Sequence, residues 1–336
     1  MKRRLLLGMA AALPLPGARA MAQGSASPGS APTGSGLAGW PSRPVRMLVG
    51  FPPAGLPDVY ARLLSERLSA MLGQAVVVEN RPGGGGTLAN ELLARTEDGH
   101  TLMSTSISMT AGAALRAGQI QYDVLRDIAP VSMISVVANG VLVHPSVPAR
   151  TIEEFVALAK AQPGRVTCAS PGNGTSGHVT QEYFKLRTGT DMVHVPYRGS
   201  GPLLPDFLGG QVQSVIDNIP VYMPHVREGR LRLLAVTTPQ RWPSEPAVPT
   251  LAETVAPGFD VRAWFGVVAP ARTPEPVLEA MNRLVVAALN EPAVARRIRD
   301  GGAEPAPTSR EEFGQFMRED MARWTEVVRV SGARAD

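Results

Sequence analysis

The feature that most constrains this chain is a junction between an apolar run and a helical pattern, residues 51–58 (FPPAGLPD). Residues 45–51 before it predict a buried strand, and the apolar residues after it recur at three- and four-residue spacing, which predicts a helix. Pro57 fits the first turn of that helix, and Asp58 fits its positive end. The junction is therefore a strand-to-helix turn whose free backbone N–H groups attract a carboxylate or a phosphate.

The same arrangement recurs in the second half of the chain. Residues 166–170 (VTCAS) predict a strand, 171–178 (PGNGTSGH) predict a turn rich in Pro and Gly, and a helix follows to about residue 188. Asn173, Thr175 and Ser176 add side-chain donors to the free N–H groups of that turn. Taken alone, either turn also fits an ordinary connection in an α/β fold. Two such turns that face each other would form a polar cleft for a small anion.

Short apolar strands alternate with helical patterns along the whole chain, which predicts α/β layers. Residues 102–106 predict a strand that ends in hydroxyl groups, and 131–134 and 141–143 predict two further strands. A capping box at Thr151 predicts the start of a helix. Residues 264–270 predict a strand that returns to the first half, and two helices, at about 274–290 and 310–331, are expected to cover that half.

The N-terminus has the pattern of an export signal. Three basic residues precede the apolar core at 5–13, and two A-x-A sites follow, which predicts a secretory signal peptide over 1–22. Arg3-Arg4 keeps a twin-arginine route open beside the general one. Residues 23–39 are rich in Gly, Ser, Pro and Ala and predict a flexible linker.

The charge count excludes one class of partner. The chain has 33 basic and 29 acidic residues, and four of the basic residues precede Gln23, which leaves a neutral mature chain. A neutral chain lacks the basic surface that nucleic-acid binding requires.

Several chemistries find no support in the motifs. The glycines at 83–86 are not followed by Gly-Lys-Ser/Thr and complete no dinucleotide fingerprint, so they indicate a tight turn with close backbone approach. The histidines show no metal-ligand spacing, so no metal and no cofactor is expected. Residues 174–178 (GTSGH) lack the Gly-x-Ser-x-Gly pattern of a serine hydrolase. Cys168 lies in an apolar strand, where it is expected to pack as a small hydrophobic residue.

A set of motifs runs in order over almost the whole mature chain: Trp40-Pro41, FPP-x-G-x-x-D at 51–58, VENRPG at 78–83, ASPGNGTS at 169–176, VPYRG at 195–199, LGGQV at 208–212, AVT at 235–237 and WFG at 264–266. With these motifs the chain resembles the Bug family of periplasmic solute-binding proteins, the binding component of tripartite tricarboxylate transporters. The resemblance implies export to the periplasm, no enzymatic activity and no cofactor.

The resemblance also implies an architecture, the two-domain periplasmic-binding-protein fold of type II (Venus flytrap), an α/β fold with a ligand cleft between the domains. Domain 1 would comprise 40–143 and 263–336, and domain 2 would comprise 144–262. In this family a carboxylate is held mainly by backbone N–H groups and ordered waters from two loops, which carry over to 54–58 and 172–178. The ligand-binding residues implied here are Phe51, Pro53, Ala54, Gly55, Asp58, Ser104, Thr105, Gly172, Asn173, Gly174, Thr175, Ser176, His178, Tyr197 and Asp217.

The chain departs from the family pattern at two positions near this cleft. Ala54 stands where the family often has Gly, which narrows the allowed backbone angles, and Gly177 stands where Pro is frequent. Asp58 is expected to help select the ligand class, by favouring ligands with a donor and repelling a second carboxylate; alternatively, Asp58 only caps its helix.

Three functions remain open at this point. The first is a monomeric receptor that delivers a small carboxylate to the integral membrane subunits of a transporter. The second is a sensory partner that docks on a membrane sensor kinase once it has bound its ligand. The third is a serine hydrolase that uses Ser176 or Ser104. The identity of the acid is not indicated by the sequence.

Overall fold

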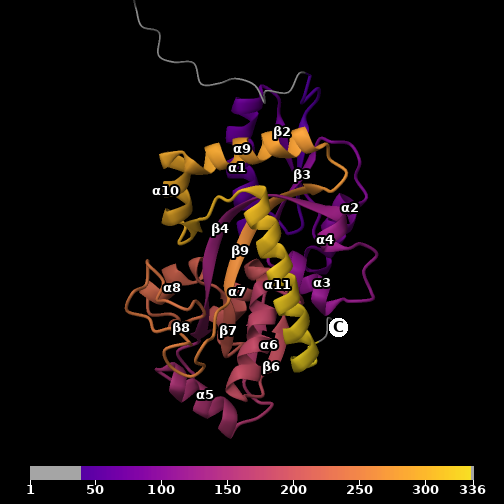
Figure 1. Ribbon diagram of the computed structural model, residues 1–336. Helices are drawn as coiled ribbons and strands as arrows, with labels where there is room; N and C mark the ends of the chain where they lie inside the picture. The colour runs from indigo at the N-terminus through magenta and orange to yellow at the C-terminus, as the bar shows by residue number, and fades with distance from the viewer. Residues whose placement is uncertain (1–38, 334–336) are drawn as a thin grey trace, which may run out of the picture. The chain divides into compact units, whose positions relative to one another are not determined.

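The computed structural model describes residues 39–333 (Figure 1). The predicted signal peptide and residues 23–38 of the predicted linker lie outside the described residues. Among the helices from residue 39 onward, none combines the length and the apolar character that a membrane crossing requires.

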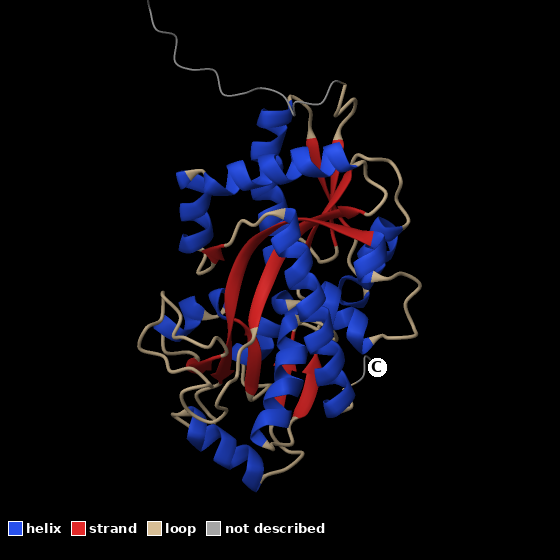
Figure 2. Cartoon of the chain, in the orientation of Figure 1, coloured by secondary structure: helices blue, strands red, loops and turns tan. Residues whose placement is uncertain are grey.

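The strands in the described part of the chain form one mixed sheet (Figure 2). Their order is β2-β1-β3-β9-β4-β7-β5-β6, and β10 and β8 also pair with β4. We call β1, β2 and β3 the first strand group, and β5, β6, β7 and β8 the second. The strands within each of the sets β2-β1-β3 and β7-β5-β6 are parallel, whereas β4 and β9 run antiparallel to their neighbours. The bounds are β1 (Val45–Val49), β2 (Val76–Asn80), β3 (Thr101–Ser106), β4 (Ile128–Val143), β5 (Thr167–Ser170), β6 (Val193–Pro196), β7 (Ser214–Asn218), β8 (Arg232–Val236), β9 (Arg262–Pro270) and β10 (Glu304–Pro305).

Helices connect the parallel strands and cover the sheet (Figure 1). Within residues 39–333, α1 and α9 pack on each other, while α11 contacts β4 and two helices, α3 after the first strand group and α6 within the second. The bounds are α1 (Leu56–Leu72), η1 (Gly84–Gly86), α2 (Thr87–Ala94), α3 (Ser108–Leu115), α4 (Val124–Asp127), α5 (Ile152–Ala161), α6 (Ser176–Thr188), α7 (Ser200–Leu208), η2 (Ile219–Val221), α8 (Met223–Arg227), α9 (Glu275–Asn290), α10 (Pro292–Asp300) and α11 (Arg310–Ser331).

The core explains why four of the five residues of β1 are apolar. Val45, Met47 and Val49 pack against α1 and α9, while Leu48 packs on the opposite face of the sheet. This alternation is the period of two that a strand imposes, here with both faces buried. The cluster that contains Leu48 continues to Ile216 of β7 and joins the two strand groups through a common core.

Local signals set several helix ends. Thr151 and Glu154 form the predicted capping box of α5, and Ser309 and Glu312 form a second one at α11. α1 ends at Gly73, whose φ of 66° suits glycine.

One prediction about the strands is wrong. Residues 131–134 and 141–143 belong to one continuous strand, β4, rather than to two. The first part of β4 pairs with β9 and β10, and its last residues pair with β7 and β8, so one strand runs through both strand groups. The predicted division into two domains at 143/144 and 262/263 stays a prediction.

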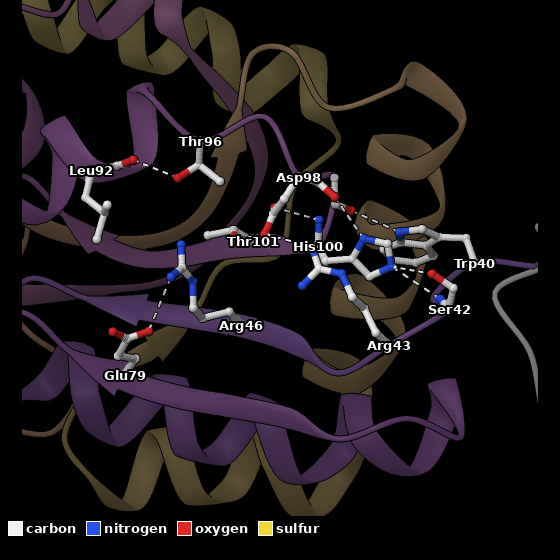
Figure 3. A network of polar contacts seen from close by, with 11 residues as sticks. Trp40, Ser42, Arg43, Arg46, Glu79, Leu92, Thr96, Asp98, His100 and Thr101 are labelled. Atoms are coloured by element: carbon white, nitrogen blue, oxygen red, sulfur yellow. Dashed lines mark hydrogen bonds and ion pairs between the residues drawn. The ribbon is translucent and has the colours of Figure 1, made fainter.

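The start of the described chain is fixed to the beginning of β3 by polar contacts (Figure 3). The indole of Trp40 donates to the carbonyl of Gly99 at 2.9 Å, and Arg43 pairs with Asp98 at 3.1 Å. Asp98 also accepts from the backbone N–H of His100 and from the hydroxyl of Thr101. The Trp40-Pro41 motif therefore lies where the fold begins, next to the turn before β3.

Candidate functional site

A cavity of about 360 Å³ lies at the carboxyl ends of strands from both groups. Its walls are the turns that follow β1, β3, β5, β6 and β7, together with Phe265 of β9. In open α/β sheets this is the edge at which ligands bind. The volume falls within the range of small-molecule sites.

Four helices begin at this cavity. Their N-cap residues are Gly55 of α1, Ile107 of α3, Thr175 of α6 and Gly199 of α7, and all four line the cavity. In none of these four does the N-cap side chain accept a hydrogen bond from the helix. The positive ends of the helix dipoles therefore point to the cavity, together with first-turn N–H groups that can hold an anion. The exceptions are the N–H of Asp58, which donates to Gly55 O at 3.0 Å, the N–H of Ser108, which donates to Ser106 Oγ at 3.4 Å, and Pro57 and Pro202, which carry none.

The sequence predicted two of these four helix starts. The starts of α3 and α7 were missed. Gly199-Ser200-Gly201-Pro202 at the start of α7 repeats the Gly- and Pro-rich signal, whereas β3 ends at Ser106 and α3 begins at Ser108, with only Ile107 between them and no Pro or Gly.

Asp58 organises the turn before α1. Its carboxylate accepts from the N–H of Ala54 at 3.0 Å, from Arg62 at 2.9 and 3.0 Å, and from the amide of Asn80 at 2.9 Å. Burial acts to raise the pKa of Asp58, but these hydrogen bonds and the charge of Arg62 lower it below its ordinary value. Asp58 does not line the cavity. The N–H of Ala54, which the sequence suggested as a ligand donor, is directed to this carboxylate.

We therefore expect Asp58→Asn to leave ligand preference unchanged and to lower the melting temperature slightly. The amide cannot accept both N–H groups of Arg62, but Arg62 is exposed and such pairs contribute little. Because the pKa of Asp58 is lowered in the folded state, its stabilising effect is present above its ordinary pKa of 3.8 and disappears as the pH falls. Melting curves of both proteins should therefore converge in acid. A changed ligand preference would restore Asp58 as a selecting residue.

Ala54 is the one non-glycine residue with positive φ among residues 39–333, at 70°. A left-handed backbone costs an L-residue about 1–2 kcal/mol. Glycine avoids this cost, but its greater flexibility in the unfolded chain offsets part of the gain in stability. We expect Ala54→Gly to raise the free energy of unfolding by about 0.5–1 kcal/mol. Urea unfolding measures this change. Ala70→Gly, at an exposed position in α1, is the control and should lower stability by about 1 kcal/mol.

The turn before α6 contains two hydroxyl groups with different surroundings. Thr175 Oγ1 donates to the carbonyl of Gly172 at 2.7 Å, a strong contact within the turn. Ser176 Oγ has only long contacts, to Asn139 at 3.4 Å and from Asn218 at 3.5 Å. Ser176 is therefore freer to turn toward a ligand than Thr175.

His178 supports this turn from behind. Its Nδ1 accepts from the N–H of Gly174 at 3.1 Å, and its ring stacks on His194 with centroids 4.2 Å apart. Burial, followed by the nearby charge of His194, lowers the pKa of His178 to about 3. The ring is neutral at ordinary pH, as its acceptor role requires.

The glycine-rich turn at 83–86 contacts the turn before α6. A Cβ built on Gly85 would lie 2.5 Å from the carbonyl oxygen of Asn173. Arg116, the residue that follows α3, donates to the same oxygen at 3.5 Å. The glycines therefore permit close backbone approach between the two strand groups, as the sequence indicated.

Asp217, at the end of β7, is fully buried and lines the cavity. Its carboxylate accepts from Ser200 Oγ at 3.1 Å, Tyr222 OH at 2.9 Å and Asn218 Nδ2 at 3.1 Å. No ion pair reaches it from the described residues. Burial raises the pKa of Asp217 to about 6, against the lowering effect of these hydrogen bonds. Ser200 is the first residue of α7, so Asp217 also fixes a helix start.

The structure brings seven of the predicted site residues together around the cavity: Phe51, Pro53, Ala54, Gly55, Thr175, Ser176 and Asp217. The other eight do not line it: Asp58, Ser104, Thr105, Gly172, Asn173, Gly174, His178 and Tyr197. Some of these support the lining, since Ser104 Oγ donates to the carbonyl of Pro57 at 2.8 Å. A ligand role for any of the fifteen remains a prediction.

Sequence reasoning missed several lining residues. Arg198 is exposed and is the one cationic side chain among the residues that line the cavity in the described chain. The remaining missed positions form mostly apolar walls, and they include Phe265, Leu204, Val221, Pro171 and Pro202.

The match to known proteins covers most of the chain. Residues 60–332 match the profile of the family described as "Tripartite tricarboxylate transporter family receptor". The chain belongs to this receptor family. BugT of Bordetella pertussis is 38% identical over 314 residues, which cover 93% of this chain and 94% of BugT.

Solved structures of other receptors have the same fold. An R. palustris protein solved with adipate is 34% identical, with a TM-score of 0.82 over 88% of this receptor and 99% of that chain. MatC from Rhodopseudomonas palustris, solved with bound malate, is 32% identical, with a TM-score of 0.80 over 86% of this receptor and 100% of MatC. The resemblance to the Bug family and the predicted α/β periplasmic-binding-protein fold of type II are thereby confirmed.

Proposed function

We propose that this receptor binds a small carboxylate in the cavity and delivers it to the membrane subunits of a tripartite tricarboxylate transporter. The observation that carries the proposal is the convergence of four uncapped helix N-termini on one cavity. Hydrogen bonds from N–H groups to a charged acceptor contribute roughly 1.5–3 kcal/mol each. An anion can thus be held without a clamp of basic side chains.

The two related structures solved with adipate and with malate support a carboxylate as the ligand. The apolar walls favour an acid with some hydrocarbon surface. The basic and apolar pattern of residues 1–22 supports export to the periplasm, and we propose that the receptor acts there as a monomer.

The receptor is proposed to bind its ligand without transforming it. Ser104 donates to a backbone carbonyl, and the contacts of Ser176 are to two asparagine side chains. Ser170, at the end of β5, lies with its Oγ 2.7 Å from Nε2 of His194, as a serine nucleophile would. Ser170 is fully buried, however, and does not line the cavity. Docking on a membrane sensor kinase would use the same ligand-bound state and is the second candidate.

A thermal-shift screen over a library of carboxylic acids tests the proposal. The protein is first unfolded and refolded to remove any acid carried over from the expression host. A ligand that binds only the folded state raises the melting temperature, and at one hundred times its Kd it stabilises by about 2.7 kcal/mol. If no acid raises the melting temperature while the refolded protein is intact, the proposed function is wrong.

A further inference from the structure

The cavity that is proposed to bind an anion carries a negative group of its own. Two carboxylates lie at or behind its walls, and their surroundings differ. Asp58 is paired with Arg62, whereas Asp217 is held only by neutral donors among the described residues. A bound carboxylate would therefore be placed near an uncompensated charge in a buried environment, where repulsion between like charges is strong.

The groups around Asp217 do not supply a compensating charge in the neutral range. Burial lowers the pKa of His178 to about 3 and that of His194 to about 4, so both rings are uncharged. Burial also raises the pKa of Cys168 to about 12 and that of Tyr222 well above its ordinary value. Arg198 is the one cationic side chain among the described residues that line the cavity, and because it is exposed, solvent screens its charge. Of Asp217, His178, His194, Cys168 and Tyr222, only Asp217 has a pKa near neutrality, at about 6.

A neighbouring amide is placed to accept a hydrogen bond from this carboxyl group once the carboxyl is protonated. Asn218 Nδ2 donates to Asp217 Oδ1 at 3.1 Å, while Asn218 Oδ1 is buried and has no hydrogen-bond partner in the described residues. If Asp217 Oδ1 gains a proton, a half-turn of the amide lets Asn218 Oδ1 accept from it. The protonated state then gives a partner to an acceptor that lacks one.

We propose that Asp217 is a specificity-determining residue that takes up one proton from solvent when an anionic ligand enters the cavity and releases it when the ligand leaves. This inference rests on the proposed carboxylate ligand. The proton passes from the buffer to Asp217 Oδ1, so that ligand and carboxyl group together carry one negative charge fewer. At higher pH the cavity selects against a ligand with a second carboxylate near Asp217.

Calorimetric titration with adipate, malate and benzoate between pH 6 and pH 8 tests this, because carboxylic acids are largely ionised throughout that range. We expect the Kd of each acid that binds to rise roughly tenfold from pH 6 to pH 8. This factor corresponds to a bound ligand that raises the pKa of Asp217 by about one unit, because one unit changes the affinity at most about tenfold. Titrations in two buffers of different ionisation enthalpy should show uptake of up to about one proton per ligand.

Variants separate this role from a structural one. Asp217→Asn should remove both the pH dependence and the proton uptake. Tyr222→Phe should keep both but move the midpoint to higher pH, because the charged carboxylate loses a donor. Asp320→Asn is the matched control: Asp320 is also buried with a raised pKa, accepts from Thr110, Trp264 and Trp324, and does not line the cavity.

Each outcome is informative. Acids that bind with an affinity independent of pH, or wild-type binding without proton uptake, would overturn the inference and leave the proposed function standing. An affinity that instead rises with pH would mean that binding releases a proton rather than taking one up, which also overturns it. Failure of all three acids and of the whole library to bind would overturn both proposals. If Asp217→Asn does not fold, the wild-type proton uptake and the Tyr222→Phe shift still decide.

Discussion

Gly177→Ala should lower the free energy of unfolding of this receptor by about 3 kcal/mol, at the upper end of the range for overpacked sites. Gly177 lies in the first turn of α6, and a Cβ there would lie 2.3 Å from the carbonyl oxygen of Ile216 and 3.1 Å from Pro171. Neither neighbour is the end of a flexible side chain, so the helix start must move away from β7. The melting temperature should fall by about 6–12 °C.

The same displacement should weaken ligand binding, because Thr175 and Ser176 move with the helix. Gly201→Ala is the matched control: Gly201 lies in the first turn of α7, where a Cβ meets nothing within 4 Å. Alanine favours a helix over glycine, so this variant should melt at the same temperature or slightly higher. If Gly177→Ala melts like Gly201→Ala, the close packing of α6 on β7 described above is wrong.

Ser176→Ala should weaken binding of the best acid from the library roughly 10- to 100-fold. The hydroxyl group lies on the cavity wall with only long contacts to protein, so a ligand can take its hydrogen bond. A hydrogen bond to a charged group contributes roughly 1.5–3 kcal/mol, and about 1.4 kcal/mol corresponds to a factor of ten in affinity. The melting temperature of the free protein should change little. Calorimetric titration beside thermal melts measures both quantities.

Thr175→Val provides the contrast one residue away. Its hydroxyl group is engaged with the carbonyl of Gly172, so its removal should cost about 1 kcal/mol of stability with a smaller effect on affinity. Unchanged affinity in Ser176→Ala together with a lowered melting temperature would assign Ser176 to the structure of the turn and leave the carboxylate site without its hydroxyl donor.

The elements with strong local signals could be predicted from the sequence. The start of α1 has Pro in its first turn and an apolar stripe after it, and α5 has a capping box. α3 was missed for a physical reason: all eight of its residues are buried, so it has no polar face and no helical periodicity. β4 was divided in two because Ser135, Asn139 and Gly140 interrupt its apolar run. These residues are buried in the structure, where Asn139 is bonded to Thr180 of α6.

The site was predictable only in part. Turns rich in Pro and Gly revealed where backbone donors lie, because those donors are a local property of the chain. Which acidic residue would keep an uncompensated charge depends on tertiary neighbours. Asp58 looked like the selecting residue from its place in the turn, yet the folded chain surrounds it with Arg62 and Asn80 and leaves Asp217 facing neutral donors.

The proposed reliance of this cavity on helix starts bears on how such receptors diversify. Every residue except proline carries a backbone N–H, so the attraction for an acid persists when the side chains of the turns are exchanged. Substitutions at Leu56, Leu204, Val221 or Phe265 can then alter the shape of the pocket without removing its preference for negative charge. One scaffold can thus pass from one nutrient acid to another through single, individually functional steps.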